Sequence, residues 1–343
     1  MKAAIRQQAR ELGFDDCRFT AADAPASADR FQSWLATKQH GEMAWLERTS
    51  PKRLDPRNVL PGAKSIIVFA ASYELGNPPS AIHHPHSGVI ARYARFTDYH
   101  NVLGERLKQL TALVQQLGGA EAKSLWHVDT GPMLERDFAQ RAGIGFIGKH
   151  TNVISRQLGN WILLGEIITT LDLEPDAPEP NRCGKCERCL EACPTRAITA
   201  PFQLDARLCI SYLTIELKGS IPIELRPAIG NRIFGCDDCL AACPWNRFAR
   251  EGRLMKEQAR PDLAAPDLLE LLQLGEAAFK SRFAGTPILR AKRRGLLRNV
   301  CVALGNTGSA STLPRLQKAA GDPEPLIAEH ARWAIGQIKS RHP

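Results

Sequence analysis

Eight of the ten cysteines in this 343-residue chain lie between residues 183 and 243, at spacings that suit a metal or cluster site. The first four form the run CGKCERCLEACP, which has the spacing C-x2-C-x2-C-x3-C and is followed by Pro194. In bacterial iron–sulfur proteins with this run, the fourth cysteine ligates the other cluster of a pair. Three thiolates at three-residue intervals can reach three corners of one cubane. The run therefore predicts one [4Fe–4S] cluster here and a second one nearby.

A second cysteine run, CDDCLAACP, begins at Cys236 but has Ile233 where the first cysteine of the pattern would stand. Cys209 lies between the two runs, and we expect it to replace the missing ligand. The eight cysteines then divide into two sets of four. We expect one [4Fe–4S] cluster on Cys183, Cys186, Cys189 and Cys243, and the other on Cys193, Cys209, Cys236 and Cys239.

The alternative for these cysteines is a pair of structural zinc sites with four thiolates each. Such sites usually combine two separated C-x2-C pairs, so the compact triple followed by Cys-Pro favours iron and sulfide. Two neighbouring clusters can pass electrons to each other, and the rest of the chain must then hold an electron acceptor. Cys17 and Cys301 stand apart and are expected to be small buried hydrophobic residues.

The segments before the cysteines predict an α/β domain over residues 1–173. KSIIVFAASY and NWILLGEIITTLDL are apolar runs typical of buried strands. DYHNVLGERLKQLTALVQQLG has apolar residues at helical spacing and ends in Gly-Gly. The acidic, proline-rich segment EPDAPEPNR separates this domain from a cysteine module at 174–250. Residues 251–343 are predicted to form a helical third domain.

The nucleotide and cobalt motifs in the first domain are incomplete. The chain has no Walker A run, and GIGFIG follows the helical stretch LERDFAQRA, whereas a dinucleotide-binding loop follows a strand. GIGFIG is therefore either a loop that lets the backbone approach a flat cofactor or a tight structural turn. In DYHNVLG the glycine comes one residue too late for the cobalamin motif D-x-H-x-x-G. We expect His100 to be a surface or structural histidine at a helix start.

The C-terminal region carries most of the positive charge. Residues 247–343 contain 17 Lys and Arg and 9 Asp and Glu, and the whole chain has a formal net charge of +9. RAKRRGLLRNVCVALGNTG and LIAEHARWAIGQI predict amphipathic helices of a HEAT-like repeat. Clustered cations on a helix are either solvated or bind phosphate. We expect RNA contacts at Arg290, Lys292, Arg293, Arg294 and Arg298.

The sequence gives no support for a membrane protein. No segment approaches the roughly 20 apolar residues that cross a bilayer, and the N-terminus alternates charged and apolar residues, unlike a secretory signal. Clustered reduced cysteines fit a cytoplasmic protein. A monomer is the simplest expectation for the oligomeric state.

Several runs together resemble the epoxyqueuosine reductase family, over essentially the whole chain. They are RLDPRNVLPGAKSIIVFAASY, ARYARFTDYH, VDTGPMLERDFAQRAGIGFIGKHTNVIS, CGKCERCLEACPTRAI and CDDCLAACPWN. The family has the same irregular second cysteine run and the same lone intervening cysteine. The resemblance implies a nitroreductase-like domain that binds cobalamin, a ferredoxin-like module with two [4Fe–4S] clusters, and a C-terminal HEAT-like domain that binds tRNA.

The resemblance also implies a reaction and its partners. The family reduces the epoxide of a modified wobble base in tRNA to an alkene and releases water, using two electrons that the clusters deliver singly to cobalamin. We expect a tRNA anticodon stem-loop and an unidentified electron donor as partners. The alternatives are a reductive dehalogenase, which shares these cofactors, and a non-catalytic electron carrier.

The resemblance carries residue roles over to the first domain. Asp129 in VDTGP matches the family's catalytic acid, and we expect it after a strand at a pocket rim, where burial would raise its pKa. Alternatively, Asp129 caps the helix that starts near Pro132. Contacts with cobalamin are expected from Arg57, Tyr93, Asp129, Lys149 and Asn152, with Tyr93 as a secondary proton relay.

Overall fold

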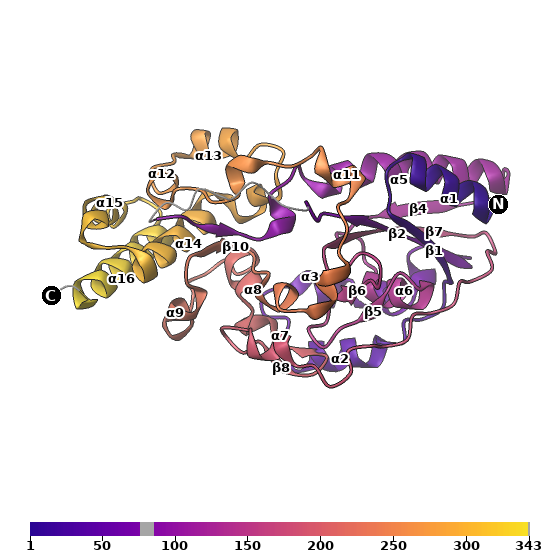
Figure 1. Ribbon diagram of the computed structural model, residues 1–343, viewed down its shortest axis with the longest axis horizontal. Coiled ribbons are helices and arrows are strands. Elements are labelled where there is room, and N and C mark those ends of the chain that lie inside the picture. The colour runs from indigo at the N-terminus through magenta and orange to yellow at the C-terminus, as the bar shows by residue number, and fades with distance from the viewer. Residues whose placement is uncertain (76–85, 342–343) are drawn as a thin grey trace.

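The computed structural model describes residues 1–75 and 86–341 and contains a four-stranded antiparallel sheet (Figure 1). The strands lie in the order β1 (Asp16–Ala21), β2 (Ser65–Ser72), β7 (Ile162–Thr169) and β4 (Ser124–His127). All eight residues of β2 are buried, as the continuous run SIIVFAAS predicts for a central strand. The two strands predicted from apolar runs are therefore confirmed.

Helices cover both faces of this sheet. Side chains alternate between the faces along a strand, so neighbours on β2 enter different cores. Phe69 packs with α1 (Lys2–Glu11) and α5 (Tyr99–Gly118), whereas Val68 packs with α6 (Glu135–Ala142). Figure 1 shows α1 and α5 above the sheet and α6 below it.

The long helix α5 is confirmed, and its two ends have clear physical causes. The Asp98 side chain accepts a hydrogen bond from the backbone N–H of His100 at 3.0 Å, which caps the first turn. Gly119 follows the last turn with a φ of +78°, in the left-handed region that favours glycine. The cap places Tyr99 and His100 at the start of the helix.

GIGFIG begins with a tight turn that ends α6 and continues into β5 (Phe146–Ile147), the first strand of a small hairpin. Gly143 ends α6 in the left-handed conformation, with a φ of +85°. A Cβ atom at Gly145 would lie close to the carbonyl oxygen of Ile154, so the two chain segments need glycine to approach each other. The structural-turn interpretation accounts for Gly143 and Gly145.

The other short elements of the first half are α2 (Ala28–Ala36), α3 (Ala44–Arg48), α4 (Ser50–Leu54), η1 (Pro56–Asn58), β3 (Val89–Ile90), η2 (Arg92–Ala94), β5 (Phe146–Ile147) and β6 (Val153–Ile154).

The cysteine module is built from short elements and is joined to the first domain. Its strand β10 (Arg232–Phe234) pairs in parallel with β3 from the first half of the chain. The carbonyl of Arg250, the last residue of the predicted module, accepts a hydrogen bond from the Ser72 hydroxyl on β2. Both contacts cross the predicted limit between the first domain and the module. The remaining elements are α7 (Arg188–Glu191), β8 (Ile198–Ala200), β9 (Gln203–Leu204), η3 (Ala206–Leu208), α8 (Ile210–Ile215), η4 (Ile223–Leu225), α9 (Arg226–Ile229), α10 (Asp238–Ala241) and η5 (Pro244–Phe248).

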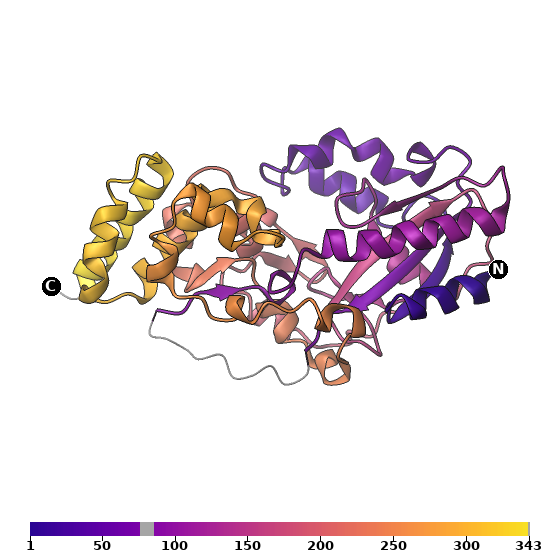
Figure 2. The same ribbon diagram turned by 90° about the horizontal axis from the view of Figure 1, so that it is seen from above.

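The C-terminal region is helical, as predicted. Its last helices, α14 to α16, lie at the end of the molecule opposite the N-terminus (Figure 1 and Figure 2), whereas α11 packs against β2. Its elements are α11 (Arg253–Lys256), η6 (Pro261–Leu263), α12 (Leu268–Leu271), α13 (Glu276–Arg282), η7 (Pro287–Ala291), α14 (Lys292–Thr307), η8 (Ala310–Thr312), α15 (Leu313–Ala319) and α16 (Pro325–Arg341).

The helix α14 is more buried than a single apolar face predicts. All of its residues from Gly295 to Gly305 are buried, because α16 packs on one side and the cysteine module on the other. Val302, for example, packs with Leu213 of α8. Among residues 1–75 and 86–341, no helix has the length and apolar character needed to span a membrane.

Candidate redox and acid–base site

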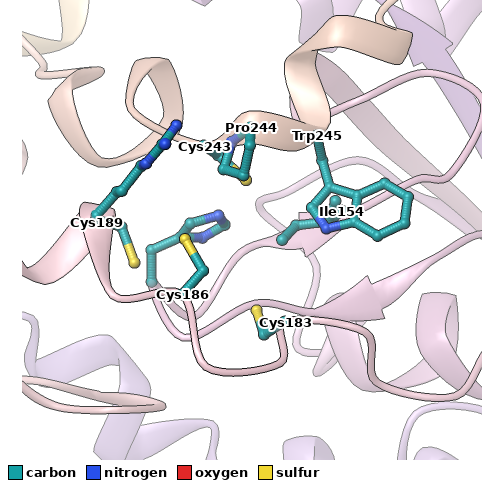
Figure 3. A pocket seen from close by; sticks show the side chains of 9 residues that line it. Ile154, Cys183, Cys186, Cys189, Cys243, Pro244 and Trp245 are labelled. Atoms are coloured by element: carbon teal, nitrogen blue, oxygen red, sulfur yellow. The ribbon is translucent and has the colours of Figure 1, made fainter.

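Four thiols from distant parts of the chain line one pocket (Figure 3). Cys183 and Cys186 lie in the loop before α7, Cys189 lies in α7 and Cys243 follows α10. The sulfurs face a shared space, and Trp245 closes one side of it (Figure 3). The structure thus brings together the first predicted ligand set.

The other four cysteines of the module line a second pocket. Cys193 follows α7, and Cys236 and Cys239 flank the start of α10. Cys209 precedes α8 and lines the same pocket, although it lies 27 positions before Cys236 in the sequence. The structure therefore brings together the second predicted set, including the lone cysteine.

The thiols need a positive centre to ionise. Burial raises the pKa of Cys189 to about 11 and that of Cys236 to about 12, so both are protonated at neutral pH without a metal. Within the described part of the chain, no three or more Cys, His, Asp or Glu side chains gather closely enough to hold a single metal ion. Thiols that surround a space fit a cluster of several atoms better than one zinc ion.

Asp129 lies just beyond β4, as predicted, with its carboxylate at an open rim. Its side chain is 54% exposed and its φ is +53°, an uncommon conformation for a residue other than glycine. The Tyr99 hydroxyl donates a hydrogen bond to Asp129 Oδ2 at 2.7 Å, and His100 Nε2 lies 3.4 Å from the same oxygen. The helix-cap alternative is wrong, because α6 starts only at Glu135 and has no side-chain cap.

The expected rise in the pKa of Asp129 is also wrong. Burial does raise its pKa, but the ion pair with His100 and the hydrogen bond from Tyr99 outweigh burial and lower the pKa to about 2. Burial lowers the pKa of His100, yet the carboxylates of Asp129 and Asp98 outweigh that effect and raise it to about 9. At neutral pH the pair therefore carries its proton on His100. His100 stands at the helix start, as predicted, but the sequence did not reveal its contact with Asp129.

Buried acceptors without partners lie behind Asp129. Glu166 on β7 is fully buried, and neither of its carboxylate oxygens has a hydrogen-bond partner. It pairs in register with His127 on β4, whose Nε2 is likewise unpartnered. Glu135 has one unpartnered oxygen, and burial raises its pKa to about 8. Buried polar groups normally have partners, so these residues fit a ligand that brings its own hydrogen-bonding groups.

Arg57 and Tyr93 do not contact the Asp129 carboxylate. Arg57 is exposed, and its guanidinium Nε donates to Asp55 at 2.8 Å. Arg53 instead is buried and donates to the Met133 carbonyl at 2.8 Å, beneath the Asp129 loop. The Tyr93 ring packs edge-on against Tyr99 with ring centroids 5.9 Å apart. Tyr99, which the sequence analysis did not single out, is the direct partner of Asp129.

Lys149 and Asn152 lie at the cysteine pockets. The Lys149 backbone N–H donates to Cys183 Sγ at 3.4 Å, and Lys149 Nζ lies 3.4 Å from Glu187. Asn152 lines the second pocket and donates its backbone N–H to His150. His150, another residue that the sequence analysis passed over, lines both pockets.

Two of the five predicted RNA-binding residues are engaged inside the protein. Arg298 is 1% exposed and donates hydrogen bonds to backbone carbonyls of the cysteine module, so it cannot contact a phosphate and its predicted role is wrong. The acceptors are the carbonyl oxygens of Leu213 at 2.6 Å, Leu217 at 2.9 Å and Gly219 at 2.7 Å. Arg293 is largely buried and forms an ion pair with Asp322.

The other three predicted RNA-binding residues reach the surface. Lys292 and Arg294 are exposed at the start of α14. Arg290 is 41% exposed, pairs with Glu216 at 2.8 Å and lies over the Trp45 ring at 5.9 Å. Its charge also helps to lower the pKa of Asp129, so Arg290 lies in the electrostatic neighbourhood of the acid–base site.

Two family models match the chain. The 4Fe-4S double cluster binding domain matches residues 182–246, which confirms the predicted double-cluster domain. The model described as Epoxyqueuosine reductase QueG, DUF1730, matches residues 53–130. The epoxyqueuosine reductase of Salmonella typhimurium is 43% identical over 336 residues, covering 97% of this chain and 87% of that protein. This chain belongs to the epoxyqueuosine reductase family.

Other members of the epoxyqueuosine reductase family agree in sequence and structure. The Escherichia coli epoxyqueuosine reductase is 41% identical, with coverage of 97% of this chain and 88% of that protein. A crystal structure of an epoxyqueuosine reductase with an epoxyqueuosine-modified tRNA-Tyr stem loop has a TM-score of 0.89 at 35% identity, covering 98% and 90% of the two chains. The Bacillus subtilis enzyme, solved with its catalytic loop swung out of the active site, has a TM-score of 0.88 at 34% identity, with the same coverage.

Proposed function

We propose that this chain reduces epoxyqueuosine to queuosine at the wobble position of tRNA. The observation that carries the proposal is the connection between the redox pockets and the acid–base site. The Tyr99 hydroxyl hydrogen-bonds to Asp129, and the Tyr93 ring packs against Tyr99. Tyr93 also contacts Phe234, which lies two residues before Cys236. A chain of side-chain contacts therefore links the second cysteine pocket with the acid–base site.

The cofactors are two [4Fe–4S] clusters and cobalamin. The two four-cysteine sets would hold the clusters, which supply electrons one at a time. The unpartnered acceptors of Glu135 and Glu166 fit cobalamin, because the amide groups around a corrin ring can donate hydrogen bonds to them. Cobalamin, when bound, supplies a strongly reducing cobalt centre for the epoxide.

The side chains of the protein supply protons and orientation. Converting an epoxide to an alkene and water consumes two electrons and two protons. Asp129 would pass a proton to the departing oxygen, and His100, which holds a proton 3.4 Å from that carboxylate, would supply it. Tyr99 fixes the carboxylate by its hydrogen bond. The strained backbone of Asp129 suits a loop that moves, as the catalytic loop does in the Bacillus subtilis relative.

We place the tRNA on the side where Arg290, Lys292 and Arg294 are exposed. A related enzyme has been crystallised with a modified tRNA stem loop, which supports an anticodon stem-loop as the substrate form. Arg290 is well placed to bind a phosphate next to the wobble nucleoside, because its charge reaches Asp129. The flipped nucleoside would then lie at the Asp129 rim.

We further assign three domains to this function. Residues 1–173 would form a nitroreductase-like cobalamin domain, residues 174–250 a ferredoxin-like module and residues 251–343 a HEAT-like tRNA-binding domain. The pairing of α14 with α16 supports the helical repeat. The enzyme would act as a cytoplasmic monomer that receives electrons from a separate donor protein.

The test is conversion of an epoxyqueuosine-containing tRNA stem-loop by protein loaded anaerobically with iron, sulfide and cobalamin. Asp129→Asn keeps the shape of the side chain but cannot donate a carboxyl proton, so turnover should fall by roughly 10²- to 10⁴-fold. The cobalamin absorption and the iron content should stay at wild-type levels. Asp172→Asn, at an exposed position, is the matched control and should retain full activity. Equal turnover in wild type and Asp129→Asn would exclude Asp129 as the acid.

A further inference from the structure

His150 has a place in the structure that no other described residue shares. It lies in the loop between β5 and β6, and among the residues described it alone lines both four-cysteine pockets. Its side chain is 3% exposed, and its Nε2 atom is buried without a hydrogen-bond partner. Buried polar atoms normally form hydrogen bonds, so a ring nitrogen without a partner between two cluster sites fits a hydrogen bond to an atom of a cluster.

The hydrogen-bond pattern fixes which ring nitrogen carries the hydrogen. The Asn152 backbone N–H donates to His150 Nδ1 at 3.2 Å, so Nδ1 is an acceptor. An imidazole whose Nδ1 accepts a hydrogen bond carries no hydrogen on that atom, so its ring hydrogen lies on Nε2. Nε2 is therefore a donor in need of an acceptor.

The loop holds the ring in place beside the first pocket. A Cβ atom at Gly148 would lie 3.0 Å from His150 Nε2 and 2.9 Å from Cε1, so the ring packs directly on the loop backbone. The preceding residue, Lys149, donates its backbone N–H to Cys183 Sγ, which ties the loop to the first pocket. The Asn160 side-chain oxygen is the competing acceptor from the protein, but it too lacks a partner in hydrogen-bonding geometry.

We propose that His150 is a positioning residue for electron transfer, whose Nε2–H donates a hydrogen bond to a sulfur of the cluster on Cys183, Cys186, Cys189 and Cys243. This inference rests on the iron–sulfur content of the proposed function. A hydrogen bond to a cluster sulfur stabilises the more negative, reduced state and so raises the reduction potential. His150 thereby sets the potential of the first cluster relative to the second.

The test is a redox titration of the loaded protein, followed by EPR, with the two cluster signals resolved. His150→Phe keeps a ring but removes the hydrogen-bond donor. We expect the one-electron reduction constant of the first cluster to fall about tenfold, which corresponds to a potential lower by about 59 mV. The second cluster should keep its potential. His150→Gln, which retains an N–H donor, should restore most of the shift. Unchanged potentials in His150→Phe, or equal shifts of both clusters, would overturn the assignment.

A measurement on the wild-type protein covers the case in which His150→Phe fails to assemble its clusters. Protein labelled with ¹⁵N-histidine should show a ¹⁵N coupling to the first reduced cluster in pulsed EPR. Absence of that coupling would contradict the proposal, whatever the variants do. Neither readout depends on tRNA or turnover, so failure here is distinguishable from failure of the proposed reaction.

Discussion

The cysteine pockets and the Asp129 site both shift the pKa values of acidic groups, but in opposite directions. In the pockets, burial dominates and raises the pKa of thiols such as Cys189 and Cys236. At Asp129, the hydrogen bond from Tyr99 and the ion pair with His100 overcome burial and keep the carboxylate charged. The pockets are therefore incomplete without a cationic cluster, whereas the acid–base group is complete in the protein alone.

The largest effect should come from removing one thiol from the pocket beside the acid–base site. Cys239→Ala deletes a proposed ligand of the second cluster, so electrons can no longer reach the Asp129 site. We expect complete loss of turnover, with about half of the iron and sulfide lost. Cys17→Ala is the matched control, because Cys17 is buried in the sheet core and should leave the iron content unchanged. Full iron content in Cys239→Ala would contradict the assignment of Cys239 as a ligand of the second cluster.

A smaller effect is expected from His100→Gln, which removes the group that carries the proton. Because the pKa of His100 is raised to about 9, wild-type turnover should be flat at neutral pH and decline as the pH rises through 9. In His100→Gln, turnover should fall about tenfold or more at pH 7, and the decline near pH 9 should disappear. Rates measured across pH 6 to 10 provide the check. A wild-type profile retained in the variant would exclude His100 as the proton store.

The same ion pair predicts how stability depends on pH. The raised pKa of His100 contributes stability that is fully present below its unfolded value of 6.5 and is lost as the pH rises through about 9. The lowered pKa of Asp129 contributes stability above about 3.8 that is lost as the pH falls through about 2. In urea unfolding, the free energy of unfolding of the wild type should exceed that of His100→Gln by a larger amount at pH 6 than at pH 9.5. An equal difference at both pH values would show that the pair adds no pH-dependent stability.

The cysteine sets could be predicted from sequence, but the acid–base partners could not. Ligand spacing along one short segment restricts the cluster assignments, and a missing ligand at Ile233 directs attention to Cys209. Tyr99 and His100 reach Asp129 only because α5 packs against the β4 edge of the sheet, a tertiary contact across 30 residues. The role of His150 could not be predicted for a similar reason, because its position between the two pockets depends on how the cysteine module folds.

Charge alone did not reveal which arginines are buried. Arg298 and Arg294 are one helical turn apart on α14, and both donate to backbone carbonyls of the cysteine module. Arg298 is buried, however, whereas Arg294 remains exposed. The sequence predicted this helix correctly. It did not show that the cysteine module covers one side of it, because that contact joins segments about 80 residues apart.

The smallest effects should separate those two arginines. Arg298→Met leaves buried carbonyls without donors, so we expect a loss of about 3 kcal/mol in the free energy of unfolding. Arg294→Gln removes one exposed hydrogen bond to the Lys218 carbonyl, so it should lower stability far less than Arg298→Met does. It should weaken tRNA binding and reduce the slope of log affinity against log salt by about 1. Urea unfolding and filter binding at graded salt provide the measurements. Weakened tRNA binding in a fully stable Arg298→Met would contradict the buried assignment.

The most direct test of the whole account is a single turnover with no external reductant. Protein loaded with iron, sulfide and cobalamin is reduced, freed of reductant and mixed anaerobically with a tRNA stem-loop that carries epoxyqueuosine. The account predicts that the EPR signals of both reduced clusters decay while the wobble nucleoside loses one oxygen atom, as mass spectrometry would show. An intact epoxide beside fully reduced clusters and bound cobalamin would contradict it.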